Sequence, residues 1–296
     1  MMPQPPFVFE HLARVTPLGM RFWDQVSRAT VSDGLVVTAY PVNNPARKVS
    51  AIANRSGIFV VQGLPGLREV EYGKGDTDFW EKFPPHVSPP NSAFVVEVVD
   101  ERGRFQPFQF TVDVPVKGLL TWESESADSP PKAFPYLPLY STPARSVPSG
   151  MAVLRADLKD GATNKLAAWA VLEARLEGQP PVQGIAGKDG RIVLVFPYPE
   201  PVSGPLGSPP GFPPSGERKP LLEQKWAVTL QAWYSASASI PDRPDLSTVF
   251  TQQPATLYAT VLPEKTLTSV TLEFGKDLIV KTELQSELFI QSVTSP

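Results

Sequence analysis

Short runs of alternating apolar and polar residues recur along the chain, separated by stretches rich in proline, glycine and polar residues. The most regular run is FQFTVDV at 108–114, whose phenylalanines and valines share one face while Gln, Thr and Asp share the other. This period of two predicts a half-buried β-strand. Further strands are predicted at 34–41, 57–66, 91–100, 150–160, 187–197, 223–235, 256–263, 266–275 and 277–293.

One segment, KLAAWAVLEARLEG at 165–178, fits two structures. Its Ala, Leu and Glu content favours a helix, whereas its alternation fits a strand. We favour the strand, because the segment occupies the place of a strand in an internal repeat, and the helix stays the alternative.

The repeat consists of two stretches, NRSGIFVVQGLPG at 54–66 and GKDGRIVLVFPYP at 187–199. In each, a polar turn ends in a glycine (Gly57 or Gly190), an apolar strand follows, and prolines end it. Glycine supplies the positive φ that tight turns need, and Asn or Asp bonds the nearby backbone. The pattern resembles the carboxypeptidase-regulatory-like or transthyretin-like β-sandwich, which implies a fold and no particular chemistry.

We therefore predict an all-β protein with two tandem transthyretin-like or Ig-like sandwiches. The predicted division is an N-terminal sandwich at 1–122, a proline-rich linker at 123–150, a second sandwich at 151–240 with a long loop at 197–220, and a C-terminal β extension at 241–296. The 35 prolines among 296 residues agree with short strands and many fixed turns.

Composition excludes several classes of function. A net charge of −3, with no long basic run, argues against nucleic acid as a partner. With no cysteine in the sequence, disulfides and thiolate metal sites are excluded. No apolar stretch is long enough to span a bilayer, and the first residues lack the pattern of a secretory signal. We expect a cytoplasmic protein, with release or membrane association of a finished particle left open.

No enzymatic constellation is visible. His11 and His86 have no neighbours suited to metal or nucleophile chemistry, and the acidic pairs flank turns or linkers. We predict no catalytic, cofactor-binding or metal-binding residues, and no cofactor.

A second resemblance is carried by the order of four segments: GIFVVQGLPGLREVE, FVVEVVDERGRFQPFQFTVDVP, LPLYSTPARSVPSGMAVLRADL and AAWAVLEARLEGQPPVQGIAGKDGRIVLVFPYPEP. It looks like that of accessory structural proteins of phage-tail-like contractile injection systems. The resemblance implies a non-enzymatic cap, baseplate or attachment part that contacts other subunits, as a symmetric oligomer. The alternative is a carbohydrate-binding or surface-binding adhesin module.

Aromatic residues with polar or proline-rich surroundings are the candidates for such an interface, because exposed rings are enriched at protein interfaces. The candidates are Trp23, Trp80, Phe134, Tyr136, Tyr140, Phe212, Phe274 and Phe289. The segments 130–148, 197–220 and 256–293 are predicted as contact elements.

Overall fold

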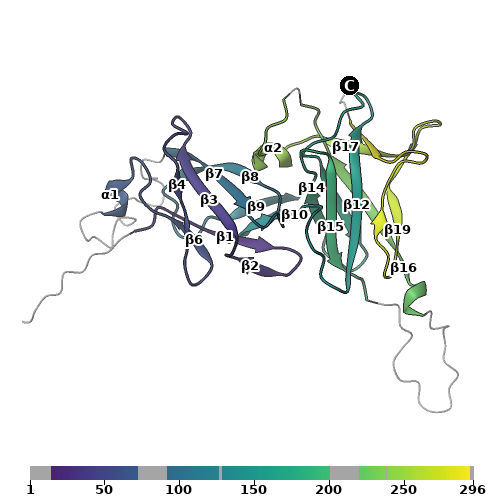
Figure 1. The fold of residues 1–296 in the computed structure, drawn as a ribbon, viewed down its shortest axis with the longest axis horizontal. Helices are drawn as coiled ribbons and strands as arrows, with labels where there is room; N and C mark the ends of the chain where they lie inside the picture. The colour runs from purple at the N-terminus through teal and green to yellow at the C-terminus, as the bar shows by residue number, and fades with distance from the viewer. Residues whose placement is uncertain (1–14, 73–91, 127–128, 201–219, 238, 294–296) are drawn as a thin grey trace, which may run out of the picture. The chain divides into compact units, whose positions relative to one another are not determined.

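The computed structural model describes residues 15–72, 92–126, 129–200, 220–237 and 239–293. Strands dominate these ranges, so the predicted all-β class is confirmed (Figure 1). The helical elements among them are one or two turns long: α1 (Arg68–Glu71), η1 (Leu221–Glu223) and α2 (Leu246–Phe250).

The first sandwich consists of two sheets. One has the order β11-β1-β6-β5 with β2 beside β1, and the other has the order β4-β3-β7-β8. Their strands are β1 (Leu18–Asp24), β2 (Ala29–Val31), β3 (Leu35–Pro41), β4 (Val49–Ser50), β5 (Ile52–Ala53), β6 (Ile58–Val61), β7 (Ser92–Asp100), β8 (Phe108–Val114) and β11 (Leu137–Leu139).

Alternation determines which side chains these strands bury. In β8 the phenylalanines and valines of FQFTVDV are buried while the residues between them are partly or fully exposed, as the sequence predicts. In β1 the residues Leu18, Met20 and Phe22 are fully buried, and Phe22 packs edge-on against Phe59 of β6 with the ring centroids 5.2 Å apart. Antiparallel pairing of β1 with β6 brings these inward positions together.

The second sandwich is larger, with the strand path β14-β13-β16-β17-β21-β12-β15 and three short strands beside it. Its core is formed by buried Leu, Ile, Val and Ala from all of the long strands. The strands are β12 (Met151–Asp160), β13 (Val171–Leu176), β14 (Val182–Ile185), β15 (Arg191–Pro197), β16 (Lys225–Trp233), β17 (Pro254–Thr260), β18 (Lys265–Thr266), β19 (Ser269–Glu273), β20 (Leu278–Ile279) and β21 (Leu288–Ser292).

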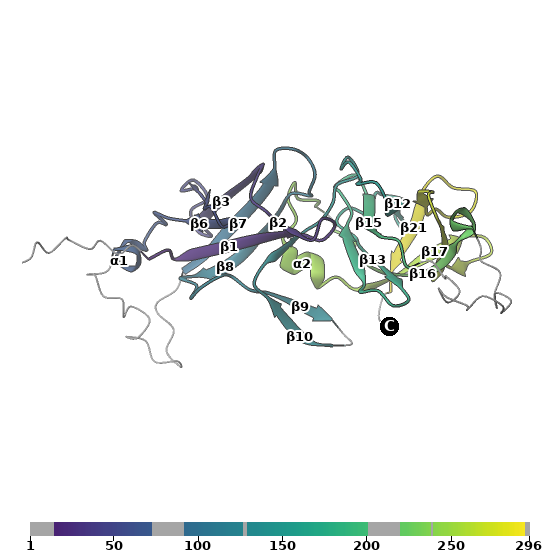
Figure 2. The same ribbon diagram turned by 90° about the horizontal axis from the view of Figure 1, so that it is seen from below.

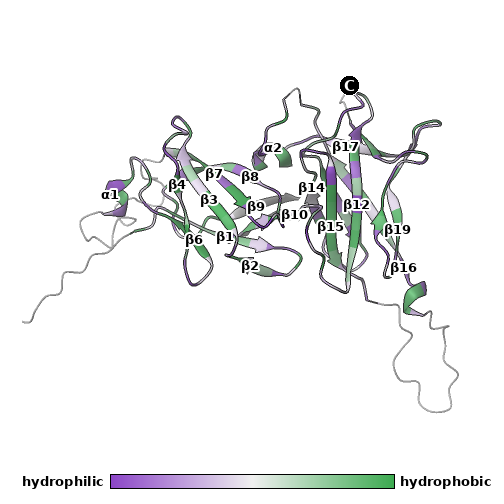
Figure 3. Cartoon of the chain, viewed as in Figure 1, coloured by the Kyte–Doolittle hydropathy of each residue, from purple (hydrophilic) through white to green (hydrophobic). Residues whose placement is uncertain are grey.

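Strand β15 is buried on both faces, and its neighbour β12 is buried on one face and partly covered on the other. One face joins the main core, while Val153, Val193 and Val195 on the other pack against Val26 in a separate cluster. Figure 3 accordingly shows hydrophobic positions running along β15. A strand buried on both sides loses the alternating pattern and reads as a continuous apolar run, which explains the unbroken IVLVF of β15.

The ambiguous segment at 165–178 forms a strand, β13, over Val171–Leu176, so the strand interpretation is confirmed. The residues before it form a turn, in which Ala186 N donates to the Ala170 carbonyl at 2.8 Å.

The compact units are interleaved along the chain, whereas the predicted domains follow one another. One unit takes 1–23, 30–99 and 109–138, and the other takes 24–29, 100–108 and 139–296. The predicted linker at 123–150 contains strands: β9 (Trp122–Ser126) and β10 (Ser129–Phe134) form the hairpin that Figure 2 shows, and β11 follows. Prolines hid these short strands from periodicity.

The predicted C-terminal extension at 241–296 does contain strands, but they belong to the second sandwich. β17 and β21 lie inside the strand path, and β19 pairs with β16. Leu257, Leu272, Leu288 and Ile290 are part of the core. Removing this segment would therefore expose the core, and it is not a detachable arm.

Candidate functional site

The glycine turn of the second sandwich borders a hollow in the protein surface. Two backbone bonds close the turn: Gly187 N donates to the Arg191 carbonyl at 2.8 Å, and Gly190 N donates to the Gly187 carbonyl at 2.9 Å. Gly190 has φ +74°, and the Asp189 carboxylate accepts from Arg191 N at 3.2 Å. Lys188 and Asp189 therefore lie at the tip of a fixed turn.

The hollow has a volume of about 560 Å³. Its wall combines polar side chains with prolines and one tryptophan, and all its residues belong to the second compact unit. They are Gly103, Gln106, Pro107, Thr142, Pro143, Ala144, Trp169, Gly187, Lys188, Asp189, Arg191 and Asp242.

The charged groups of the hollow neutralise one another. Lys188 Nζ lies 2.5 Å from Asp242 Oδ1, and this ammonium holds the pKa of Asp242 below its usual value. Arg191 Nε lies 3.7 Å from Asp189 and 3.9 Å from Asp157. General acid–base catalysis needs a group poised to exchange a proton, and these paired, exposed charges provide none. The hollow is suited to hydrogen bonding a polar ligand.

Trp169 forms a fixed wall of the hollow. Its backbone has φ +60°, a left-handed conformation that costs a bulky residue free energy. Two bonds hold it there: the indole Nε1 donates to the Pro241 carbonyl at 3.2 Å, and Gln252 Nε2 donates to the Trp169 carbonyl at 2.8 Å. The residue is 7% exposed, so it contributes mostly to packing.

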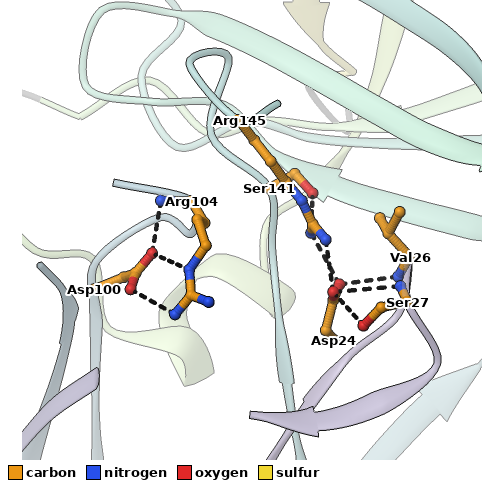
Figure 4. A network of polar contacts seen from close by, with 7 residues as sticks. All are labelled: Asp24, Val26, Ser27, Asp100, Arg104, Ser141 and Arg145. Carbon is orange, nitrogen blue, oxygen red and sulfur yellow. Dashed lines mark hydrogen bonds and ion pairs between the residues drawn. The ribbon is translucent and has the colours of Figure 1, made fainter. Parts of the chain in front are cut away.

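A buried ion pair lies elsewhere in the same unit (Figure 4). Arg145 donates from both terminal nitrogens to Asp24, at 2.8 and 2.6 Å, and the two side chains are 9% and 5% exposed. Val26 N and Ser27 N also donate to Asp24. Burial opposes ionisation of Asp24, but the bonds from Arg145, Ser27 and Val26 outweigh it and hold its pKa below the usual value.

A second carboxylate and arginine stand beside this pair (Figure 4). Asp100 accepts from Arg104 N at 2.6 Å and from its guanidinium at 3.0 and 3.1 Å. The guanidinium carbons of Arg104 and Arg145 lie 5.1 and 4.9 Å from the centre of the Phe105 ring. Burial again opposes ionisation, yet the bonds from Arg104 keep the pKa of Asp100 below its usual value. Arg104 and Arg145 thus share the Phe105 ring, which connects the local Asp100–Arg104 pair with the long-range Asp24–Arg145 pair.

The candidate interface residues that the structure describes are divided between the two compact units. Trp23 and Tyr136 stack with centroids 5.1 Å apart and are each half-buried in the first unit. In the second unit Tyr140 is buried, and burial raises the pKa of its hydroxyl. Trp80, Phe212 and the side chain of Phe134 lie outside the described residues, as do His11 and His86.

The other two candidates lie in the second unit. Phe274 packs against Tyr198 with centroids 4.7 Å apart, and Trp226 completes an aromatic group. Phe289 is half-buried in β21. These rings are core-edge residues, because each is partly covered by its own unit.

Two leucines that the sequence analysis did not single out are the most exposed large apolar residues of the described chain: Leu262 at 91% and Leu284 at 95%. They lie in the loops after β17 and β20. No periodicity or motif identifies them in the sequence, because what sets them apart is the exposure of their side chains in the folded protein.

Within the described ranges, no group of three or more His, Asp or Glu side chains is placed to bind a metal ion. In the same ranges no helix has both the length and the apolar character needed to cross a bilayer.

No protein-family model and no curated protein matches the sequence. Among solved structures, the chain is similar to the shaft pilin SpaA from Lactobacillus rhamnosus GG, with 8% identity, 95% of this chain and 99% of that chain covered, and a TM-score of 0.23. A Streptococcal ancillary pilin has 14% identity, with 90% and 61% covered and a TM-score of 0.22. The Bacillus anthracis TIE protein has 12% identity, with 95% and 49% covered and a TM-score of 0.23.

The chain thus spans 61% of the ancillary pilin and 49% of the TIE protein. At these TM-scores the similarities carry no argument about the arrangement or activity of this chain. The comparisons therefore lend no support to the resemblance to proteins of contractile particles.

Proposed function

We propose that the protein is a non-enzymatic structural component that acts through contacts with other protein subunits in a larger assembly. The observation that carries this proposal is that the charged side chains described above are paired with one another. The buried Asp24–Arg145 pair links residues 121 positions apart, and the charges around the hollow are paired with each other. Breaking a buried pair costs far more than breaking an exposed one, so such pairing favours a rigid body over a reactive site.

The finer proposal is a cap, baseplate or attachment part of a contractile phage-tail-like particle, present as a symmetric oligomer. Its support is the order of sequence segments that resembles those accessory proteins. Assembly in the cytoplasm is part of this proposal, since the chain contains no cysteine for a disulfide.

The experiment is to tag the protein in its native host and fractionate gentle lysates by sedimentation. We expect the protein in a fast-sedimenting complex, with sheath and tube proteins identified in the same fraction by mass spectrometry. A protein found only as a free monomer would contradict the structural role. A complex without sheath and tube proteins would contradict the contractile particle alone.

A carbohydrate-binding adhesin is the second candidate, favoured by the half-buried stack of Trp23 on Tyr136. Aromatic rings with one open face suit the apolar face of a sugar ring. On a glycan array, binding that disappears in Trp23→Ala but persists in Phe289→Ala would support this candidate. Absence of glycan binding by the unaltered protein would exclude it.

A further inference from the structure

Two loops of the second sandwich each present an almost fully exposed leucine. Leu262 lies between β17 and β18, and Leu284 lies between β20 and β21. They are 91% and 95% exposed. A single exposed leucine is ordinary on a protein surface, but a pair on neighbouring loops is a feature to explain.

Hydrogen bonds fix the loop of Leu284 to the end of β17, the strand that leads into the loop of Leu262. Glu283 N donates to the Ala259 carbonyl at 2.7 Å, and the Thr282 hydroxyl donates to the Tyr258 carbonyl at 2.8 Å. The same hydroxyl accepts from Phe289 N at 2.9 Å, and Thr282 is fully buried. The segments that carry the leucines are therefore anchored to each other, and little ordering remains to be done on binding.

Leu284 has a backbone that does not favour leucine. Its φ is +63°, in the left-handed region that glycine and asparagine occupy at lower cost. An exposed leucine at this position neither favours the left-handed backbone conformation nor adds a side chain to the core. Strain of this kind gathers at functional sites, so the side chain has a use outside the isolated fold.

The surrounding charges distinguish among the possible occupants. Glu264, Glu283 and Glu287 outnumber Lys281 on the two loops and Lys265 at the start of β18, for a net charge of −1 over these five residues. An anionic membrane attracts basic surfaces and is disfavoured. A symmetric contact with a second copy would bring the glutamates of both copies together, and opposed like charges are unfavourable.

We propose that Leu262 and Leu284 are paired anchors that insert into an apolar groove with a basic rim on a partner protein subunit. The inference rests on the proposed function, and it names the contact surface and the chemistry of the partner. Hot spots of this kind are a few buried side chains at the centre of an interface.

The test uses the full chain in its native host, with a photoreactive amino acid at position 262 or 284. We expect both positions to crosslink to the same protein, at apolar residues of one groove. Leu262→Ser and Leu284→Asn should each weaken incorporation into the assembly about tenfold or more, since burying a leucine contributes at least that factor. Asparagine suits the left-handed backbone, so Leu284→Asn should unfold at the same temperature as the unaltered protein or higher.

The matched control is Leu222→Ser, which removes another exposed leucine, 77% exposed, at η1. It should incorporate normally. If the unaltered protein joins an assembly and both anchor variants join equally well, the inference fails while the proposed function stands. If the unaltered protein joins no assembly, the proposed function fails.

Two further results would also overturn the inference. Flotation with phosphatidylglycerol vesicles that depends on Leu262 would assign the loops to a membrane surface. Self-association in sedimentation analysis that Leu284→Asn abolishes would assign them to a second copy of the chain.

Discussion

The glycine turns of the two sandwiches have the same backbone bonds but different surroundings. In the first, Asn54 N donates to the Ile58 carbonyl and Gly57 N donates to the Asn54 carbonyl. In the second, Gly187 N donates to the Arg191 carbonyl and Gly190 N donates to the Gly187 carbonyl. The glycines have φ of +72° and +74°. Each turn opens a strand that pairs antiparallel with an earlier one, β6 with β1 and β15 with β12.

What differs is how each turn is held. A methyl group on Gly190 would lie 2.6 Å from the Leu158 carbonyl oxygen, whereas one on Gly57 would find nothing closer than 3.7 Å. The first turn depends on its own side chain, because Asn54 Oδ1 accepts from both Ser56 N and Ile58 N. The same backbone turn is therefore restricted by packing against Leu158 in the second sandwich and by bonds to the Asn54 side chain in the first.

The largest expected effect comes from the glycines. Gly190→Ala should lower the free energy of unfolding by about 2–5 kcal/mol, because backbone strain and a backbone clash add. Gly57→Ala should cost about 1–2 kcal/mol, from strain alone. Urea unfolding of both variants measures this, and equal losses would show that packing does not distinguish the turns.

Acid should weaken the second unit through Asp24 and Asp100. Their pKa values are lowered in the folded protein from 3.8, so the stabilisation they contribute is present above that pH and is lost as pH falls through the folded values. We expect the urea midpoint to fall below about pH 4. Asp24→Asn should be less stable at neutral pH and should show a shallower acid loss, whereas an unchanged slope would contradict the assignment.

Removing a turn side chain should cost more stability in the first turn than in the second, which is the reverse of the order expected for the glycine substitutions. Asn54→Ala removes two bonds to the backbone and should cost about 1 kcal/mol, whereas Asp189→Ala removes one weaker bond and should cost about half of that. Hydrogen exchange at Ile58 and Arg191 would report the local loss. A larger effect at Asp189 would mean that the second turn also depends on its side chain.

The smallest effect is expected from the charges that the repeat does not share. Lys188→Ala removes an exposed pair with Asp242 and should leave the urea midpoint unchanged. A marked loss of stability would give the pair a structural role. Loss of ligand binding in this variant, with stability unchanged, would instead mark the hollow as a working site.

Periodicity predicted the strands that alternate or run apolar, such as β8 and β15, because their pattern is local. Among the strands it missed are β10, which contains two prolines, and several strands of two to four residues, and it also overlooked the alternation of Leu18, Met20 and Phe22 in β1. It could not show that β17 and β21 complete the core of the second sandwich, because strand pairing across the chain is a tertiary property. The same limit applies to Leu262 and Leu284, which look like any other leucines until their exposure is known. The stretch 24–29 belongs to the second unit, where Asp24 pairs with Arg145, and neither residue is distinctive in the sequence.

Gly184 of β14 affects the solution behaviour of the second sandwich. A methyl group there would lie 2.5 Å from the Leu194 side chain and 3.2 Å from the Val193 carbonyl, so β14 and β15, the two ends of the strand path, lie against each other. Unpaired strand edges recruit other chains and begin aggregation. Absence of a side chain at this position lets the two end strands of the path approach each other closely, which leaves less of their open edges accessible to other chains.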